Sequence, residues 1–367
     1  MRLIQQKQCH SVPSSFNHLA EYYTYHFKLF TDNDSLCAQV VFSEIGATVF
    51  SLETWDRTQK LEDILVGYTD HADYLRQDCY FGTTIGRHAN RIARGEFALA
   101  EKQYQLAINN APNNLHGGPW GFNCQRFDAT LVKEDDSLVG INFRYISPDG
   151  DQGFPGEVIV DITYRFQMLD ESTGSWRLAI QHTAKVSEPT LVNLTNHAYF
   201  NLHPQNQDAL EHLLVINADH YTPIDENLIP TGEIAEATGL FSFRKLASVG
   251  SHLDLRNPQQ KIANGLDHNF VLRSACADLT ESAAVLYSPH SGRKLTLSCT
   301  QPGLQLYTAN YPASGKDKFE RSFVKHDSIC LEPQYFPNSI NQAGFIKPIT
   351  TPEKPYFQVI NWDFTVV

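Results

Sequence analysis

The stretch VIVDITYRFQMLDESTGSWRLAIQHTAKV (Val158–Val186) contains two runs in which apolar and polar side chains alternate. In the first run one face carries only apolar side chains, namely Val160, Ile162, Tyr164, Phe166 and Met168. The second run, from Trp176 to Val186, repeats the pattern, and ESTGS (Glu171–Ser175) between them is typical of a tight turn. Successive side chains of a strand point to opposite faces, so the stretch predicts a β-hairpin with one buried face.

The same patterns recur along the chain and predict further strands. A second hairpin is expected from Ala284–Tyr287 and Lys294–Cys299, with shorter strands at Gln39–Glu44, Gln103–Ile108, Gly140–Tyr145 and Leu304–Ala309. No long amphipathic helical pattern occurs, and only a short helical turn is expected around Asp70–Gln77. We therefore expect an all-β fold, a large antiparallel β-sandwich.

The chain shows no low-complexity linker and no repeat, and its Pro and Gly residues stand singly at predicted turns. A length of 367 residues would allow two domains of average size, but all-β folds often exceed that size in one domain. We expect residues 1–367 to form a single domain, with about the first 20 residues peripheral to it.

The charge balance limits the classes of partner. The sequence has 29 basic and 41 acidic residues, a formal charge of −12, and no Lys/Arg stripe. This disfavours nucleic acid and anionic membranes as partners, and it disfavours phosphorylated substrates, which usually require clustered Arg and Lys.

The seven cysteines are scattered and contain no C-x-x-C pair, which predicts reduced and mostly buried thiols. The first residues, MRLIQQKQCHSVPSS, lack the apolar core of a signal peptide, and no apolar run has membrane-spanning length. We therefore expect a cytoplasmic protein.

Two segments carry residues suited to proton transfer. NLTNHAYFNL (Asn193–Leu202) places His197 among amides and apolar residues on a predicted strand, and CLEPQYFPNSIN (Cys330–Asn341) places Glu332 between apolar residues. A histidine exchanges protons near neutral pH, and a carboxylate can act as a base. Together they indicate acid/base chemistry on an uncharged polar substrate.

Further polar residues suit sugar hydroxyls. GRHANRIARGEF (Gly86–Phe97) sets Asn90 beside Arg91, a dense array of hydrogen-bond donors. A surface turn with a structural ion pair would explain the same residues.

NNLHGGPWGF (Asn113–Phe122) sets His116 before a Gly pair that would allow close approach of the backbone to a ligand. Trp120 and Phe122 could offer an apolar platform for a sugar face. A turn histidine that packs for structural reasons is the alternative.

Two loop residues complete the candidate set. NGLDHNFVL (Asn264–Leu272) carries Asp267 where a loop enters a strand, and its carboxylate could accept bonds from vicinal hydroxyls or could cap a turn. TQPGLQLYTAN (Thr300–Asn310) carries Gln301 before a Pro-Gly turn, where an amide is usually structural.

Several catalytic motifs do not occur in the sequence. It contains no H-E-x-x-H, no zinc-spaced Cys/His set, no P-loop, no G-x-G-x-x-G and no G-x-S-x-G. We therefore predict neither a metal nor any other cofactor, and no acyl-enzyme.

Taken in order, the motifs GRxANRI, LHGG, DG followed by FPG, TNHxYFNL, LDHNF, QPG and ExQxFPxSIN resemble the aldose 1-epimerase (galactose mutarotase) family from about Gly86 to Asn341. The resemblance implies a large β-sandwich with its site in an open cleft on one face. It also implies cofactor-free interconversion of the α and β anomers of free aldoses such as galactose and glucose. Gln152 stands where the family often has Glu, EPQYF where ETQHF is common, and the first 80 residues match less clearly.

Carried over residue by residue, the resemblance makes His197 the general acid and Glu332 the general base. It assigns the holding of the sugar to Asn90, Arg91, His116, Asp267 and Gln301. The acid role requires a protonated His197 while the sugar is cyclic, and a nearby carboxylate would favour this by raising the pKa of the imidazole.

Two other functions remain open at this point. A glycoside hydrolase could use Glu332 and Asp267 as its two carboxylates, which would leave His197 without an obvious role. A non-catalytic sugar-binding or sugar-sensing protein would usually have lost His197 or Glu332. Galactose, glucose, xylose and arabinose share most of the hydroxyls involved, and no sequence feature indicates an oligomeric state.

Overall fold

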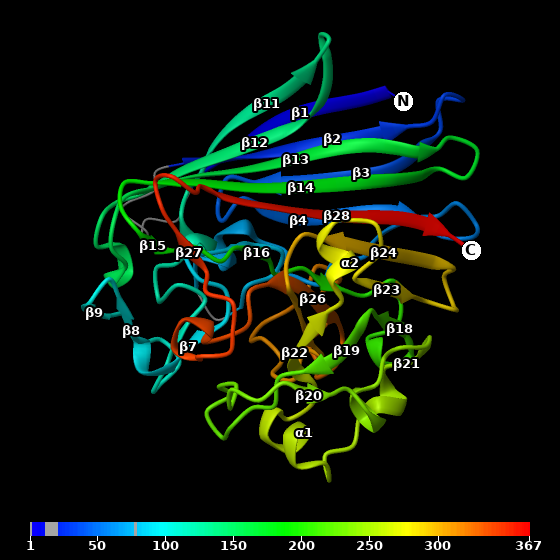
Figure 1. Cartoon of the computed structure of the whole chain (residues 1–367). Helices are drawn as coiled ribbons and strands as arrows, with labels where there is room; N and C mark the ends of the chain where they lie inside the picture. Colours follow the sequence, from blue (N-terminus) through cyan, green and yellow to red (C-terminus); the bar gives the residue numbers. More distant parts are fainter. Residues whose placement is uncertain (1, 12–20, 77–78) are drawn as a thin grey trace.

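The computed structural model describes residues 2–11, 21–76 and 79–367, and the strands there pair antiparallel in three large and four small sheets (Figure 1). The nine-stranded sheet has the order β11 (Asp128–Glu134), β12 (Ser137–Ser147), β13 (Val158–Asp170), β14 (Ser175–Val186), β28 (Tyr356–Val366), β24 (Arg293–Cys299), β23 (Ala284–Tyr287), β18 (Leu213–Ile216) and β21 (Ala247–Ser248). The six-stranded sheet has the order β17 (Tyr199–Phe200), β26 (Ile329–Gln334), β25 (Gly303–Tyr307), β22 (Asp267–Leu272), β19 (Ala218–Tyr221) and β20 (Ala235–Glu236). The five-stranded sheet runs through β1 (Arg2–Ser11), β2 (Glu21–Phe30), β3 (Leu36–Ser43), β4 (Thr48–Trp55) and β5 (Leu61–Asp63).

The smaller elements connect these sheets. The two-stranded sheets are β6 (Thr84–Ile85) with β16 (Thr195–Asn196), β7 (Arg91–Ile92) with β10 (Asn114–Leu115), β8 (Glu96–Leu99) with β9 (Lys102–Gln105), and β15 (Thr190–Leu191) with β27 (Ile349–Thr350). The described α-helices are α1 (Pro258–Ala263) and α2 (Ser274–Ala277), and short 3₁₀ turns make up the remaining helical residues. Neither helix is long and apolar enough to cross a bilayer. The predicted all-β antiparallel class is thus confirmed.

The stretch that predicted a hairpin forms β13 and β14, the third and fourth strands in the order of the nine-stranded sheet, drawn in green in Figure 1. Its apolar face packs on the five-stranded sheet, with ring centroids 4.6 Å apart for Tyr164 and Phe42 and 5.1 Å apart for Phe166 and Phe27. The six-stranded sheet joins the same core through Phe200, whose ring lies 5.1 Å from that of Trp362. Each such aromatic pair adds about 0.5–1.5 kcal/mol to the apolar burial.

The turn between β13 and β14 depends on glycine. Gly174 has a φ of 64°, and a Cβ on it would lie 2.5 Å from the Trp55 ring. The Asp170 carboxylate accepts hydrogen bonds from the amide and hydroxyl of Ser172, which closes the turn. The predicted turn therefore has both the residues and the contacts that a tight hairpin requires.

Most of the other predicted elements also occur. β23 and β24 form the second hairpin, while β3, β12 and β25 cover the shorter predictions. A 3₁₀ turn spans His71–Arg76, and Gln77 lies outside the described residues. The strand predicted for Gln103–Ile108 ends at Gln105, because the amides of Leu106 and Ala107 bond to the carbonyls of Gly95 and Gln152.

The N-terminal segment is an outer strand. β1 pairs only with β2 in its sheet, and most of its side chains are exposed. Residues 12–20, which belong to the segment expected to be peripheral, lie outside the described residues.

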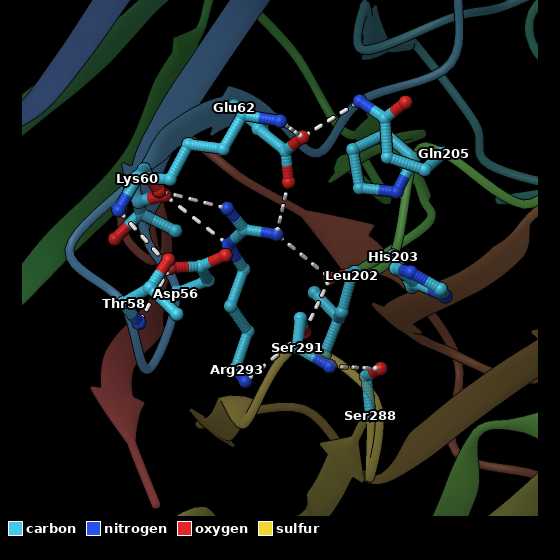
Figure 2. A network of polar contacts seen from close by, with 12 residues as sticks. Asp56, Thr58, Lys60, Glu62, Leu202, His203, Gln205, Ser288, Ser291 and Arg293 are labelled. Carbon is cyan, nitrogen blue, oxygen red and sulfur yellow. Dashed lines mark hydrogen bonds and ion pairs between the residues drawn. The ribbon is translucent and has the colours of Figure 1, made fainter.

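A buried guanidinium links the nine-stranded sheet to the five-stranded sheet and to the segment that follows β17 (Figure 2). Arg293 of β24 is 1% exposed and donates to the carbonyl oxygens of Thr54, Lys60 and Leu202, and to the carboxylate of Glu62 at 3.0 Å. A buried charge is tolerated when its donors are satisfied in this way. Leu202 ends the segment that contains His197, so the network also anchors one side of the candidate site.

Candidate functional site

The segment expected to form one strand around His197 is in fact two short strands. β16 pairs with β6 and β17 pairs with β26, and His197 lies in the gap between them. In the gap, the His197 amide donates to the Thr83 carbonyl and its carbonyl accepts from the Gly82 amide. The prediction of a continuous strand was therefore wrong, because the segment changes partners at His197.

Glu332 lies in the middle of β26. Its side chain is on one face of the six-stranded sheet, and the leucine side chains of the sheet pack into the core on the opposite face. The ladder pairs Glu332 with Gln305 of β25, and Gln305 with Asn269 of β22. Paired residues of an antiparallel ladder point to the same face. Three polar side chains thus form a row across the sheet.

The two proposed proton-transfer groups meet in space. The Nε2 atom of His197 lies 3.6 Å from Oε1 of Glu332, and both side chains are at most 5% exposed. Burial lowers the pKa of His197 to about 3 and raises the pKa of Glu332 well above its usual range. The expectation of a raised pKa for His197 is therefore wrong, because the loss of hydration on burial is the largest effect on this group and lowers its pKa.

Asn90 and His116 fix each other. Both adopt left-handed backbone conformations, with φ of 65° and 53°. The backbone N–H of Asn90 donates to Nδ1 of His116 at 3.2 Å. The side-chain oxygen of Asn90 accepts from the backbone N–H of Arg91 at 2.8 Å. A neutral His116 therefore carries its ring proton on Nε2 and can donate it. Burial lowers the pKa of His116 well below its usual range, which favours this neutral form.

Arg91 and Asp267 face each other as a buried ion pair. Nη1 of Arg91 lies 3.7 Å from Oδ2 of Asp267, and the Arg91 Nε donates to Oδ1 of Asn110 at 3.1 Å. Of the alternative, a surface turn with a structural ion pair, the ion pair is present but the surface turn is not, since the Arg91 side chain is only 9% exposed. Burial raises the pKa of Asp267, while Arg91 and Gln305 act in the opposite direction.

The structure brings Gln305, and not Gln301, to Asp267. Gln305 donates from Nε2 to Oδ1 of Asp267 at 2.6 Å, whereas Gln301 donates to the Tyr356 hydroxyl at 3.0 Å and does not line the cleft. The alternation of GLQLY could have identified Gln305, because its side chain faces away from those of Leu304 and Leu306.

Two expectations for the NNLHGGPWGF segment fail. A Cβ on Gly117 would lie 2.0 Å from the Gly86 carbonyl oxygen, so this glycine permits close approach to the protein's own backbone rather than to a ligand. Phe122 is buried against Phe127 and Tyr145, and neither it nor Trp120 lines the cleft. The predicted apolar platform therefore does not form.

The remaining candidates surround one cleft of about 400 Å³. Six residues singled out in the sequence line it: Asn90, Arg91, His116, His197, Asp267 and Glu332. The sequence did not single out the others: Cys79, Tyr80, Asn110, Leu115, Tyr199, Leu228, Tyr307 and Tyr311. Four of these eight are tyrosines, so the wall of the cleft contains several aromatic rings.

Three cleft residues have a spacing that a metal ion could use. One ligand atom from each of His116, His197 and Glu332 lies within 4.8 Å of the other two. Coordination through Nε2 of His116 would need the ring proton on Nδ1, where it would face the Asn90 amide proton. The hydrogen bonding therefore favours donation to a hydroxyl oxygen over metal binding.

Comparisons with known proteins point to one family. A family described as aldose 1-epimerase matches residues 28–361. The chain is 40% identical over 324 residues to the galactose mutarotase of Sus scrofa, covering 88% of this chain and 89% of the relative. It is 39% identical over 329 residues to the human galactose mutarotase, with the same coverage, and 31% identical over 341 residues to the aldose 1-epimerase of Escherichia coli (strain K12), covering 92% and 95%.

Solved structures are similar as well. An aldose epimerase homologue from C. elegans superimposes with a TM-score of 0.79 at 27% identity, covering 90% of this chain and 96% of the other. A galactose 1-epimerase from Lactobacillus acidophilus NCFM has the same fold, with a TM-score of 0.82 at 24% identity and 99% of both chains covered. From the match over residues 28–361 and these identities, the chain belongs to the aldose 1-epimerase family.

Proposed function

We propose that this mutarotase interconverts the anomers of a free aldohexose with Glu332 as the base at the C1 hydroxyl and His197 as the acid at the ring oxygen. Glu332 takes the C1 hydroxyl proton, His197 protonates the ring oxygen, and the bond between C1 and the ring oxygen breaks to give the open-chain aldehyde. Rotation about the C1–C2 bond presents the other carbonyl face, and ring closure reverses both proton transfers. The single observation that carries this assignment is the 3.6 Å contact between the two side chains inside the cleft.

The buried environment supports proton transfer to and from the sugar. In the ion-paired form, His197 and Glu332 carry two opposite charges in a site with little hydration, and burial disfavours both of these charges. Ring opening leaves a neutral histidine and a neutral carboxylic acid, so the transfer removes both buried charges. The pair is best treated as one unit that holds a single mobile proton, and Arg91 favours the ionised carboxylate.

The other polar groups of the cleft would hold the sugar while C1 turns. Arg91 and Asp267 offer donors and acceptors to vicinal hydroxyls, and Gln305 fixes the Asp267 carboxylate. His116 would donate from Nε2 to a hydroxyl oxygen. We therefore propose that Gln305, which like Gln301 does not line the cleft, takes the place of Gln301 by fixing the Asp267 carboxylate, and that Asn90 acts by fixing His116 and Arg91.

A polarimetric time course tests the function directly. Freshly dissolved α-D-galactose and α-D-glucose should approach anomeric equilibrium much faster with the protein than without it. A p-nitrophenyl galactoside should remain intact in the same solution, since a hydrolase using Glu332 and Asp267 would release nitrophenol. Binding of galactose without faster mutarotation would instead identify a sugar-binding protein.

We also propose that the chain is a single domain that works in the cytoplasm on a small free sugar. One continuous core includes residues from Tyr25 in the second strand to Phe364 in the last. The thiols of Cys37, Cys124, Cys276, Cys299 and Cys330 are buried, as expected for a reducing compartment.

A further inference from the structure

We propose that Tyr80 and Tyr199 are positioning residues that hold the plane of the His197 imidazole and stabilise its cationic form through their ring faces. The inference depends on the acid role proposed for His197. It assigns a function to two cleft residues, of which Tyr199 stands in the TNHxYFNL motif without an assigned role and Tyr80 stands in none of the motifs.

Both tyrosine rings lie nearly parallel to the imidazole. The ring centroid of Tyr199 is 4.9 Å from that of His197 with an interplanar angle of 17°, and the ring centroid of Tyr80 is 5.7 Å away at 23°. The other rings near His197 meet it at steep angles, His116 at 73° and Tyr307 at 79°. Among the residues that the structure describes, only the two stacked tyrosines therefore present a ring face to the face of the imidazole.

Hydrogen bonding alone does not orient this histidine. Its backbone is fixed by Thr83 and Gly82, but Nδ1 of His197 is buried and has no hydrogen-bond partner among the residues described. In many catalytic sites a carboxylate or carbonyl bonds to that second nitrogen and sets the ring orientation. Here the stacked rings are the contacts available to keep Nε2 directed at Glu332.

The same rings favour a positive charge on the imidazole. The face of an aromatic ring is electron-rich and attracts a cation, more strongly when the cation is poorly hydrated. His197 is 4% exposed, so water contributes little to stabilising its charge. Two ring faces would offset part of the burial effect at the moment when His197 carries the mobile proton.

The tyrosines are themselves held firmly. Tyr199 pairs with Cys330 in the strand that carries Glu332, and its ring lies 4.6 Å from that of Phe81. The Tyr80 ring contacts His116 with centroids 4.5 Å apart. Each ring therefore links His197 to a second element of the site.

The test compares the ring and the hydroxyl at both positions, and the electrostatics of the ring at Tyr80. Tyr80→Phe and Tyr199→Phe keep the ring and should keep at least about half of kcat, whereas Tyr80→Leu and Tyr199→Leu should lower kcat about tenfold with KM changed less than about threefold. Tyr80→pentafluorophenylalanine preserves shape but reverses the ring's charge distribution, and it should resemble the leucine variant. Tyr104→Leu is the matched control, because Tyr104 stacks on Phe97 at 5.1 Å in the β8–β9 hairpin and does not line the cleft.

Each outcome has a definite reading. A higher KM with unchanged kcat in the leucine variants would show that the rings contact the sugar. Equal losses of kcat in the Phe and Leu variants would assign the effect to the hydroxyl. Either result overturns the proposal. Wild-type kcat in the fluorinated protein would also overturn it, and that variant remains informative if a leucine variant does not fold. His197→Asn is measured in the same assay. If His197→Asn is inactive while Tyr80→Leu is fully active, only the inference on the tyrosines fails. If His197→Asn is fully active, the proposed acid role of His197 fails as well.

Discussion

The Nε2 atom of His197 lies 3.6 Å from Oε1 of Glu332, although one residue sits in the gap between β16 and β17 and the other in β26. This distance is too long for a hydrogen bond, so a sugar oxygen can approach both groups without first breaking a strong contact between them. The contact therefore suits two groups that exchange protons with a substrate more than a purely structural ion pair.

Glu332→Gln and His197→Asn should each lower kcat by a factor of about 1,000 or more, since a general acid or base contributes roughly 100- to 10,000-fold. Galactose affinity should stay within a few-fold, because both substitutions preserve shape and hydrogen-bonding capacity. Mutarotation by polarimetry and binding by calorimetry separate the two effects. Either variant turning over like wild type would remove that residue from the mechanism.

Gln305→Ala and Gln301→Ala should have different effects. Gln305 bonds to Asp267, so its loss should raise KM about tenfold by freeing the carboxylate that holds the sugar. Gln301 bonds to the buried Tyr356 hydroxyl, so its loss should lower the free energy of unfolding by about 1 kcal/mol and leave KM unchanged. Steady-state kinetics and urea unfolding of both variants check the pair. A raised KM in the Gln301 variant alone would restore the assignment made from the sequence.

Stability should fall in mild acid because of buried histidines such as His182. Burial lowers the pKa of His182 to about 4 from 6.5, so the unfolded chain binds a proton at a pH where the folded chain does not. The contribution of His182 is complete above pH 6.5 and is lost as the pH falls toward 4, by about 2 kcal/mol at pH 5. Urea unfolding of wild type and His182→Gln at pH 7.5 and 5.0 measures the difference. Equal pH dependence in the two proteins would contradict the expected linkage.

Free hexoses should be much better substrates than their 6-phosphates. The cleft contains the acidic groups Glu332 and Asp267, and Arg91, its only cationic side chain among the lining residues, already faces Asp267. A phosphate would bring about two negative charges without a matching cluster of cations, so kcat/KM should fall at least about 100-fold. A side-by-side assay of glucose and glucose 6-phosphate decides this, and preference for the phosphate would require a different substrate-holding set.

Local patterns in the sequence predicted much of the fold. Alternation in Val158–Val186 is a property of single strands, and it identified β13 and β14 with their turn. It could not show that the His197 segment changes partners, because strand pairing depends on distant residues such as Thr83 and Cys330. The segment's apolar residues fit one long strand equally well.

The sequence predicted site residues that stand in a distinctive motif. It did not predict residues that only strand pairing or ring stacking brings to the site. His197 and Glu332 stand in distinctive motifs, and the structure brings them together. Alternation in GLQLY indicates that Gln305 faces away from Leu304 and Leu306, but its pairing with Glu332 depends on a distant strand, and the ring stacking of Tyr80 leaves no local signal. The pKa of His197 likewise depends on packing from several elements, which no spacing of residues reveals.

The change of strand partners at His197 also constrains how the chain can vary in length. Thr195 and Asn196 are in register with β6, while Tyr199 and Phe200 are in register with β26. One inserted or deleted residue between these two pairs would shift a side-chain register on one side or the other and turn the imidazole away from Glu332. In laboratory evolution, functional variants should therefore tolerate insertions and deletions in surface loops, whereas residues 195–200 should tolerate only substitutions.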